Sequence, residues 1–224
     1  CGLMDQMACS VGNLVYIDFK NPGKPIVEKV KFDMEQYGYS LCITDTKGSH
    51  ADLTEEYAAV PKEMQLVAKH FGQNVLRGIT VQDIMKEIVT LRSRYGDRSV
   101  LRAIHFICEN ERVGQEVAAL KDDDFDLFLQ HVKESGDSSY KYLQNVYSNN
   151  DILSQNISVA LAASDVMLAE NGVSRVHGGG FAGTIQAFVK NSHVKEYKKN
   201  MDLIFGEGSC SDLRIRKHGG IQVV

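Results

Sequence analysis

The sequence has no run of apolar residues that approaches the roughly 18–20 residues of a membrane-spanning helix. It also has no excess of positive charge: the formal net charge is −4, which gives no electrostatic reason to expect a nucleic acid or an anionic membrane as a partner. The five cysteines form no C-x-x-C pair and are odd in number. We therefore expect free thiols, a reducing compartment and a cytoplasmic location.

Several catalytic and metal-binding motifs are also missing. The seven histidines are scattered and form no H-x-x-x-H pair or Cys/His cluster, so the sequence predicts no metal ligands. There is no G-x-x-x-x-G-K-[ST] loop, no G-x-G-x-x-G in a strand-to-helix setting and no G-x-S-x-G elbow. These absences exclude the usual P-loop, dinucleotide-binding and serine-hydrolase patterns.

The pattern of apolar residues predicts strands, then a block of helices, then strands again. Residues 1–11 have helical spacing and end at a glycine, and Thr80 is expected to cap a helix. Pro61 is expected near a helix start. The predicted strands are 14–19, 26–32 and 39–44, expected to form an antiparallel meander, and 172–176, 184–189, 212–216 and 221–224. The predicted helices are 53–71, 80–91, 99–120, 124–132, 140–146, 156–170 and 193–205. This order indicates an α+β fold with helices on one side of an antiparallel sheet.

The segment 175–183 makes the strongest demand on the backbone, because four glycines occupy the six positions from 178 to 183. Glycine reaches positive φ readily, but inside regular structure it costs roughly 0.5–1 kcal/mol relative to alanine. The flanking runs are rich in β-branched residues, so the glycines are expected to join two strands. Two interpretations stay open: a tight hairpin connection, or a loop whose N–H groups face an anion or another ligand.

Three blocks of the sequence, Cys-Gly-Leu-Met-Asp-Gln at residues 1–6, a segment at 49–57 and the glycine-rich residues 177–183, resemble motifs of the galactokinases, members of the GHMP family of small-molecule kinases. Residues 1–6 read Cys-Gly-Leu-Met-Asp-Gln and are similar to the family's C-G-[ILV]-M-D-Q block. Residues 177–183 are similar to its T-G-G-G-F-G-G motif, and residues 49–57 fall where it carries an R-H-S-L-x-x-S-E-Y-like segment. The order and rough separations of the blocks agree, so the resemblance covers essentially the whole chain.

The resemblance implies roles for individual residues. Asp5 matches the catalytic aspartate, which takes the proton from the anomeric hydroxyl of the sugar as that hydroxyl attacks the γ-phosphate of ATP. Gly2 matches a backbone contact to the sugar, and Tyr57 matches a tyrosine that lines the sugar pocket. The family's glycine motif lies near the nucleotide and the active site, and the residues that match it here are Gly178, Gly179, Gly180, Phe181 and Gly183. The alternatives are a helix-surface acid for Asp5 and a core aromatic residue for Tyr57.

The chain departs from the family's motifs at four positions. His177 stands in place of the threonine that opens the glycine motif, and it could form a hydrogen bond in the threonine's place. Ala182 replaces one of the glycines, which predicts that this position does not need positive φ. Ser49 and Glu55 replace the arginine and the serine of the middle segment, and these changes affect the contacts inferred around Tyr57.

The family's G-E-H-x-D sugar motif and its ATP phosphate loop are not found in the 224 residues. We therefore expect a C-terminal portion of a galactokinase that is inactive by itself, because the ligands of Mg²⁺ and ATP lie mostly in the missing part. Residues 1–48 would be the tail of the N-terminal kinase domain, carrying the three-strand meander. Residues 49–224 would form the GHMP kinase C-terminal domain, with an antiparallel ferredoxin-like sheet and a helical layer.

The activity implied for the whole protein is transfer of the γ-phosphate of MgATP to the anomeric hydroxyl of galactose, giving galactose 1-phosphate. Its partners would be the sugar and ATP, with no nucleic acid and no membrane. The alternatives are a kinase for another sugar, such as N-acetylgalactosamine, and a non-catalytic relative that senses galactose. The segment 175–183 is expected to brace the nucleotide loop and the Asp5 region, and to be mobile or remodelled in this chain alone.

Overall fold

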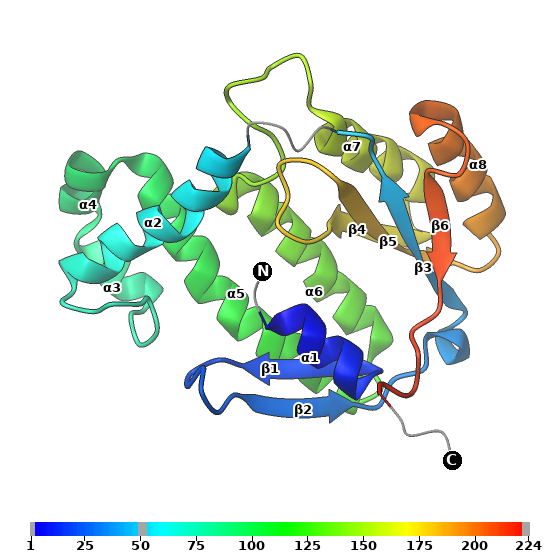
Figure 1. The fold of residues 1–224 in the computed structure, drawn as a ribbon, viewed down its shortest axis with the longest axis horizontal. Coiled ribbons are helices and arrows are strands. Elements are labelled where there is room, and N and C mark those ends of the chain that lie inside the picture. Colours follow the sequence, from blue (N-terminus) through cyan, green and yellow to red (C-terminus); the bar gives the residue numbers. More distant parts are fainter. Residues whose placement is uncertain (1–2, 49–52, 221–224) are drawn as a thin grey trace.

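A four-stranded antiparallel sheet organises the larger part of the chain (Figure 1). The computed structural model describes residues 3–48 and 53–220. The elements are, in order, α1 (Met4–Val11), β1 (Leu14–Asp18), β2 (Ile26–Val30), η1 (Met34–Tyr37), β3 (Tyr39–Asp45), α2 (Thr54–His70), α3 (Val81–Lys86), α4 (Ile88–Tyr95), α5 (Asp97–Lys121), α6 (Phe125–Ser138), η2 (Ser139–Leu143), α7 (Asn156–Leu168), β4 (Gly172–Val176), β5 (Thr184–Lys190), α8 (Val194–Phe205) and β6 (Cys210–Leu213). Within the described residues, no helix is both long enough and apolar enough to cross a membrane.

The sheet has the strand order β4-β5-β3-β6, and every neighbouring pair is antiparallel. Along the chain, β3 is followed by a block of helices, then by β4 and β5, then by α8 and β6. This β-α-β-β-α-β order with β3 in the interior of the sheet is the ferredoxin-like arrangement. The predicted α+β fold class, with its antiparallel sheet and helical layer, is confirmed.

The predicted three-strand meander is wrong. β1 and β2 pair as a separate hairpin, whereas β3 pairs with β5 and β6, so that Ile43 lies opposite Gln186 and Ser211. The sequence pattern identifies β3 as a strand but does not specify its partners, which come from far along the chain. The pairing places β3 in the same sheet as strands from the C-terminal part of the chain. The division of the chain into two domains stays a prediction.

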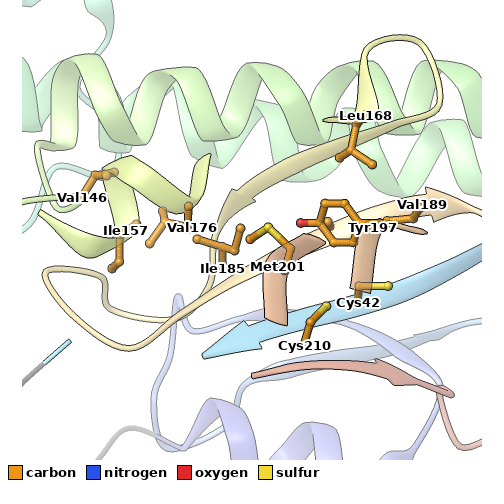
Figure 2. Packing of buried hydrophobic residues seen from close by; sticks show 12 residues of the cluster. Cys42, Val146, Ile157, Leu168, Val176, Ile185, Val189, Tyr197, Met201 and Cys210 are labelled. Atoms are coloured by element: carbon orange, nitrogen blue, oxygen red, sulfur yellow. The ribbon is translucent and has the colours of Figure 1, made fainter. Parts of the chain in front are cut away.

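Helices cover both faces of the sheet, which corrects the expectation that they lie on one side. On one face, the buried side chains of β3 and β5, including Cys42 and Ile185, pack with α7 and with Tyr197 and Met201 of α8 (Figure 2). On the other face, Phe188 of β5 packs with the aromatic side chains of α6. Residues of β5 therefore contribute to two apolar cores, because successive residues of a strand point to opposite faces of the sheet.

A third apolar cluster lies between α2 and the helices α3, α4 and α5, away from the sheet. Pro61 lies inside α2 rather than near its start, so that prediction is wrong. Proline there removes one backbone hydrogen bond of the helix. The residue is exposed, so water can reach the carbonyl group that loses its donor.

Local signals place several element boundaries. Gly12 ends α1, and Thr80 and Asp83 form the capping box that starts α3. The predicted helix 80–91 is instead two helices that meet at Glu87, and the predicted helix 140–146 is the short π-helical turn η2. The last strand is Cys210–Leu213 rather than 212–216. The strand predicted for 221–224 lies outside the described residues.

Candidate functional site

The glycine-rich loop joins β4 to β5, as the sequence predicts, and its two halves differ. Gly178 and Gly179 are exposed, whereas Gly180, Phe181 and Ala182 are buried. Positive φ occurs at Gly178 (71°), Gly180 (79°) and Gly183 (98°), and also at Phe181 (59°). Ala182 does not have positive φ, as its side chain predicts. The packing of the second half does not fit the expectation that the whole loop is remodelled in this chain.

Asn145 holds the buried half of the loop. Its carbonyl oxygen accepts a hydrogen bond from the N–H of Phe181 at 2.5 Å, and its Nδ2 donates to the carbonyl oxygen of Gly179 at 3.2 Å. A Cβ atom at Gly180 would lie 1.9 Å from the Asn145 carbonyl oxygen. Only glycine fits there, because both the space and the backbone conformation exclude a side chain. No sequence motif indicates Asn145, and sequence reasoning missed it.

Tyr57 contacts the same loop from α2. Its hydroxyl donates a hydrogen bond to the carbonyl oxygen of Gly180 at 2.6 Å, and its ring meets the Phe181 ring edge-on with centroids 5.3 Å apart. A Cβ atom at Gly179 would lie 2.9 Å from the Tyr57 ring. Burial raises the pKa of the Tyr57 hydroxyl, so it keeps its proton and stays a donor. The structure therefore brings Tyr57 and the glycine loop together.

Asp5 lies in the first turn of α1 and is exposed. Partial burial lowers the pKa of His177, the Arg175 guanidinium lowers it further, and the Asp5 carboxylate opposes them. Asp5 is therefore close enough to the start of the glycine loop to interact with it, and Figure 1 shows the first residues of α1 on the side facing that loop. A hydrogen bond of 3.0 Å joins His177 Nδ1 and Thr184 Oγ1, in line with the expectation that His177 can form one. Gly2 and Ser49 lie outside the described residues.

The exposed half of the loop presents unused hydrogen-bond donors. Among the residues that the structure describes, the N–H groups of Gly178 and Gly179 have no acceptor. Successive free N–H groups in a loop with alternating backbone conformation can donate to the oxygen atoms of an anion or a polyol. The loop is thus both a tight connection between strands and a set of donors, so the two interpretations are compatible.

A buried ion-pair network connects α2 and α5 to the segment that carries Asn145. Arg102 of α5 is 0% exposed, and its Nη1 contacts Glu63 of α2 at 2.9 Å. Its Nε donates to the carbonyl oxygen of Leu143 at 3.0 Å, directly before the segment that carries Asn145. Burial lowers the pKa of Arg102, while the Glu63 carboxylate opposes the change. The network therefore links α2, which carries Tyr57, to the second residue that holds the loop.

A second polar cluster lies beside β4. Arg175 Nη1 donates to Ser135 Oγ at 2.7 Å and lies 3.8 Å from Glu109 Oε1, and the Ser135 hydroxyl donates to Glu109. Burial raises the pKa of the nearby Glu116 to about 7, against the opposing charge of Arg175. In the described part of the chain, no three His, Cys, Asp or Glu side chains gather as a metal ion would require.

Comparisons with known proteins find the same family as the sequence motifs. No family model matches the chain. It is 30% identical over 222 residues to the galactokinase of Thermotoga petrophila, covering 95% of this chain and 58% of that protein. It is 27% identical over 202 residues to the galactokinase of Actinobacillus pleuropneumoniae serotype 5b, covering 89% and 49%. The chain thus spans about half the length of the curated relatives it matches.

Solved structures show the same fold. The galactokinase of Lactococcus lactis, complexed with galactose, matches with a TM-score of 0.72 at 19% identity, covering 100% of this chain and 56% of that one. The mevalonate kinase of L. major, in complex with R-mevalonate, matches with a TM-score of 0.52 at 13% identity, covering 96% and 53%. The resemblance to galactokinases indicated by the motifs is confirmed in sequence over at least 89% of the chain and in fold over its whole length.

Proposed function

We propose that the whole protein carrying this chain is an ATP-dependent sugar kinase that phosphorylates the anomeric hydroxyl of galactose. The observation that carries this proposal is the glycine loop held by Tyr57 and Asn145, in a chain similar to proteins named galactokinase, with the Asp5 carboxylate near enough to act on the pKa of His177 at the start of that loop. The two curated relatives named above are 27% and 30% identical to it, and the matching L. lactis structure is complexed with galactose.

Asp5 is the proposed proton acceptor. The anomeric oxygen forms a bond to the γ-phosphorus of ATP, the bond from that phosphorus to the β–γ bridging oxygen breaks, and ADP leaves. The proton of the hydroxyl passes to the Asp5 carboxylate. Phosphoryl transfer depends mainly on positioning and charge stabilisation, so an exposed carboxylate aimed at the hydroxyl both orients and activates it.

The glycine loop and Tyr57 are proposed to shape the ligand site beside Asp5. The free N–H groups of Gly178 and Gly179 would donate to sugar or phosphate oxygens. The Tyr57 hydroxyl already donates to Gly180, so we assign to Tyr57 a wall of the sugar pocket formed by its ring, which is partly exposed. Gly2 would add a backbone contact to the sugar.

Magnesium ligands are not assigned to this chain. Among the described residues, no group of three or more His, Cys, Asp or Glu side chains could hold a metal ion. In kinases, Mg²⁺ is held by only one or two carboxylates together with the phosphates of the substrate. We propose that the whole protein supplies the ligands of Mg²⁺ and most of those of ATP from outside this chain. The chain alone is then inactive. We also propose that the whole protein acts in the cytoplasm.

The test is ATP-dependent phosphorylation of a panel of sugars by the whole protein. We expect galactose 1-phosphate as the product and a clear preference for galactose over N-acetylgalactosamine. Turnover only with another sugar would support the alternative kinase, and sugar binding without turnover would support a galactose sensor. Robust turnover by the 224-residue chain alone would contradict the assignment of the phosphate site to a part outside it.

A further inference from the structure

In this chain, the helix that carries Asp5 makes few contacts with other elements. Within α1, no residue is buried, and its main contact among the described helices and strands is with β1. Asp5 lies in the first turn, about 10 Å along the helix axis from Gly12, the residue that ends the helix. Whatever fixes the end of α1 therefore also sets the direction in which Asp5 points.

The backbone of the segment 216–220 lies against that end of the helix (Figure 1). The N–H of Asn13 donates to the carbonyl oxygen of Arg216 at 2.7 Å, and the N–H of Gly220 donates to the carbonyl oxygen of Ser10 at 3.1 Å. Because the carbonyl groups in the last turn of a helix lack partners within it, the segment satisfies one that would otherwise need water.

Two glycines make this close approach possible. A Cβ atom at Gly12 would lie 2.4 Å from the backbone nitrogen of Gly219, and Gly12 also has a φ of +71°. A Cβ atom at Gly219 would lie 2.0 Å from the carbonyl oxygen of Ser10. A methyl group at either position would therefore push the helix and the segment apart.

Lys29 of β2 joins the two sides. Its Nζ donates to the carbonyl oxygen of Val11 at 3.3 Å and to that of Lys217 at 2.7 Å. The last turn of α1 contains no basic residue of its own. Lys29 therefore supplies the positive charge that favours a helix C-terminus, and it does so while holding the segment 216–220 against the helix.

We propose that the segment 216–220 is a clasp that positions Asp5 by fixing the end of α1, with Gly219 and Lys29 as positioning residues. The proposal rests on the proposed role of Asp5 as proton acceptor. A tilt of about 10° at the clasp moves Asp5 by about 2 Å, given the length of the helix. A misplacement of this size lowers turnover by about 10–100-fold, since near-attack geometry tolerates little error.

The test combines amide hydrogen exchange on the chain with steady-state kinetics of the whole protein. In Gly219→Ala, we expect faster exchange in residues 4–11, unchanged protection of the four-stranded sheet, and a kcat about 10–100-fold lower with little change in the KM for galactose. Gly220→Ala is the matched control, because its methyl group meets no atom within 4 Å and the N–H that bonds Ser10 is kept.

A second variant keeps the test valid if Gly219→Ala does not fold. Lys29→Met should also speed exchange in residues 4–11 and lower kcat. Lys29→Arg should show nearly wild-type exchange and kcat, because arginine retains the N–H donors and the positive charge. Unchanged exchange in α1, or faster exchange with normal kcat, would overturn the proposal. A whole protein without turnover would refute the proposed function, and the exchange experiment would then decide whether the clasp fixes α1.

Discussion

Gly178 and Gly180 share a positive φ but differ in their surroundings, so they form a matched pair for substitution. Gly178 has a φ of +71°, and a methyl group added there would meet nothing within 4 Å. At Gly180, with a φ of +79°, the added methyl group would lie 1.9 Å from the Asn145 carbonyl oxygen. Gly178→Ala should therefore cost only the backbone strain of an alanine at positive φ, about 1 kcal/mol of unfolding free energy.

Gly180→Ala should cost more, because the loop must move away from Asn145. It would lose the bonds of Asn145 to Phe181 and Gly179, each worth about 1 kcal/mol, and add an overpacking cost of about 1–3 kcal/mol. With the φ strain, the total is about 4–6 kcal/mol. Urea unfolding of the chain followed by circular dichroism measures both variants. A difference between them below about 1 kcal/mol would refute the claim that Asn145 fixes the loop.

Two further predictions concern buried charge. Glu116→Gln should stabilise the chain by about 1–3 kcal/mol at pH 8 and by much less at pH 5. The folded state raises the pKa of the Glu116 carboxyl to about 7, so the wild-type chain loses stability as the pH rises through 7 and this carboxyl ionises. An equal gain in unfolding free energy over the wild-type chain at both pH values, or the same gain from the exposed control Glu111→Gln, would contradict this prediction. Arg102→Met should destabilise the chain by about 2–4 kcal/mol, since Glu63 and the Leu143 carbonyl group lose a donor, whereas the exposed Arg94→Met should change stability by about 1 kcal/mol or less; similar thermal unfolding midpoints for the two variants would contradict the role given to the network.

Features set by neighbouring residues could be predicted from the sequence. The glycine that ends α1, the Thr80 capping box and the glycine loop between two strands each depend on chemistry within a few positions. The motif resemblance supplied Asp5 and Tyr57. The structure places Tyr57 in contact with the glycine loop, and the Asp5 carboxylate acts on the pKa of His177 at the start of that loop.

Features set by distant contacts could not be predicted. The pairing of β3 with β5 and β6 depends on strands that follow a long block of helices, and a strand pattern shows burial but not partners. Asn145 holds the loop through its backbone carbonyl and side-chain amide, and neither has a sequence signature. The contact of Gly12 with Gly219 joins the two ends of the described chain, where each glycine alone indicates only a turn.

The most direct measurement of the central claim is galactose 1-phosphate formation by the whole protein with Asp5→Asn. The substitution keeps the size of the side chain but removes the base, and Asp5 is exposed, so the fold should be unchanged by circular dichroism. We expect kcat to fall by about 10²–10⁴-fold, the range of a lost general base. A folded variant with nearly normal kcat would contradict the assignment of Asp5 as the proton acceptor.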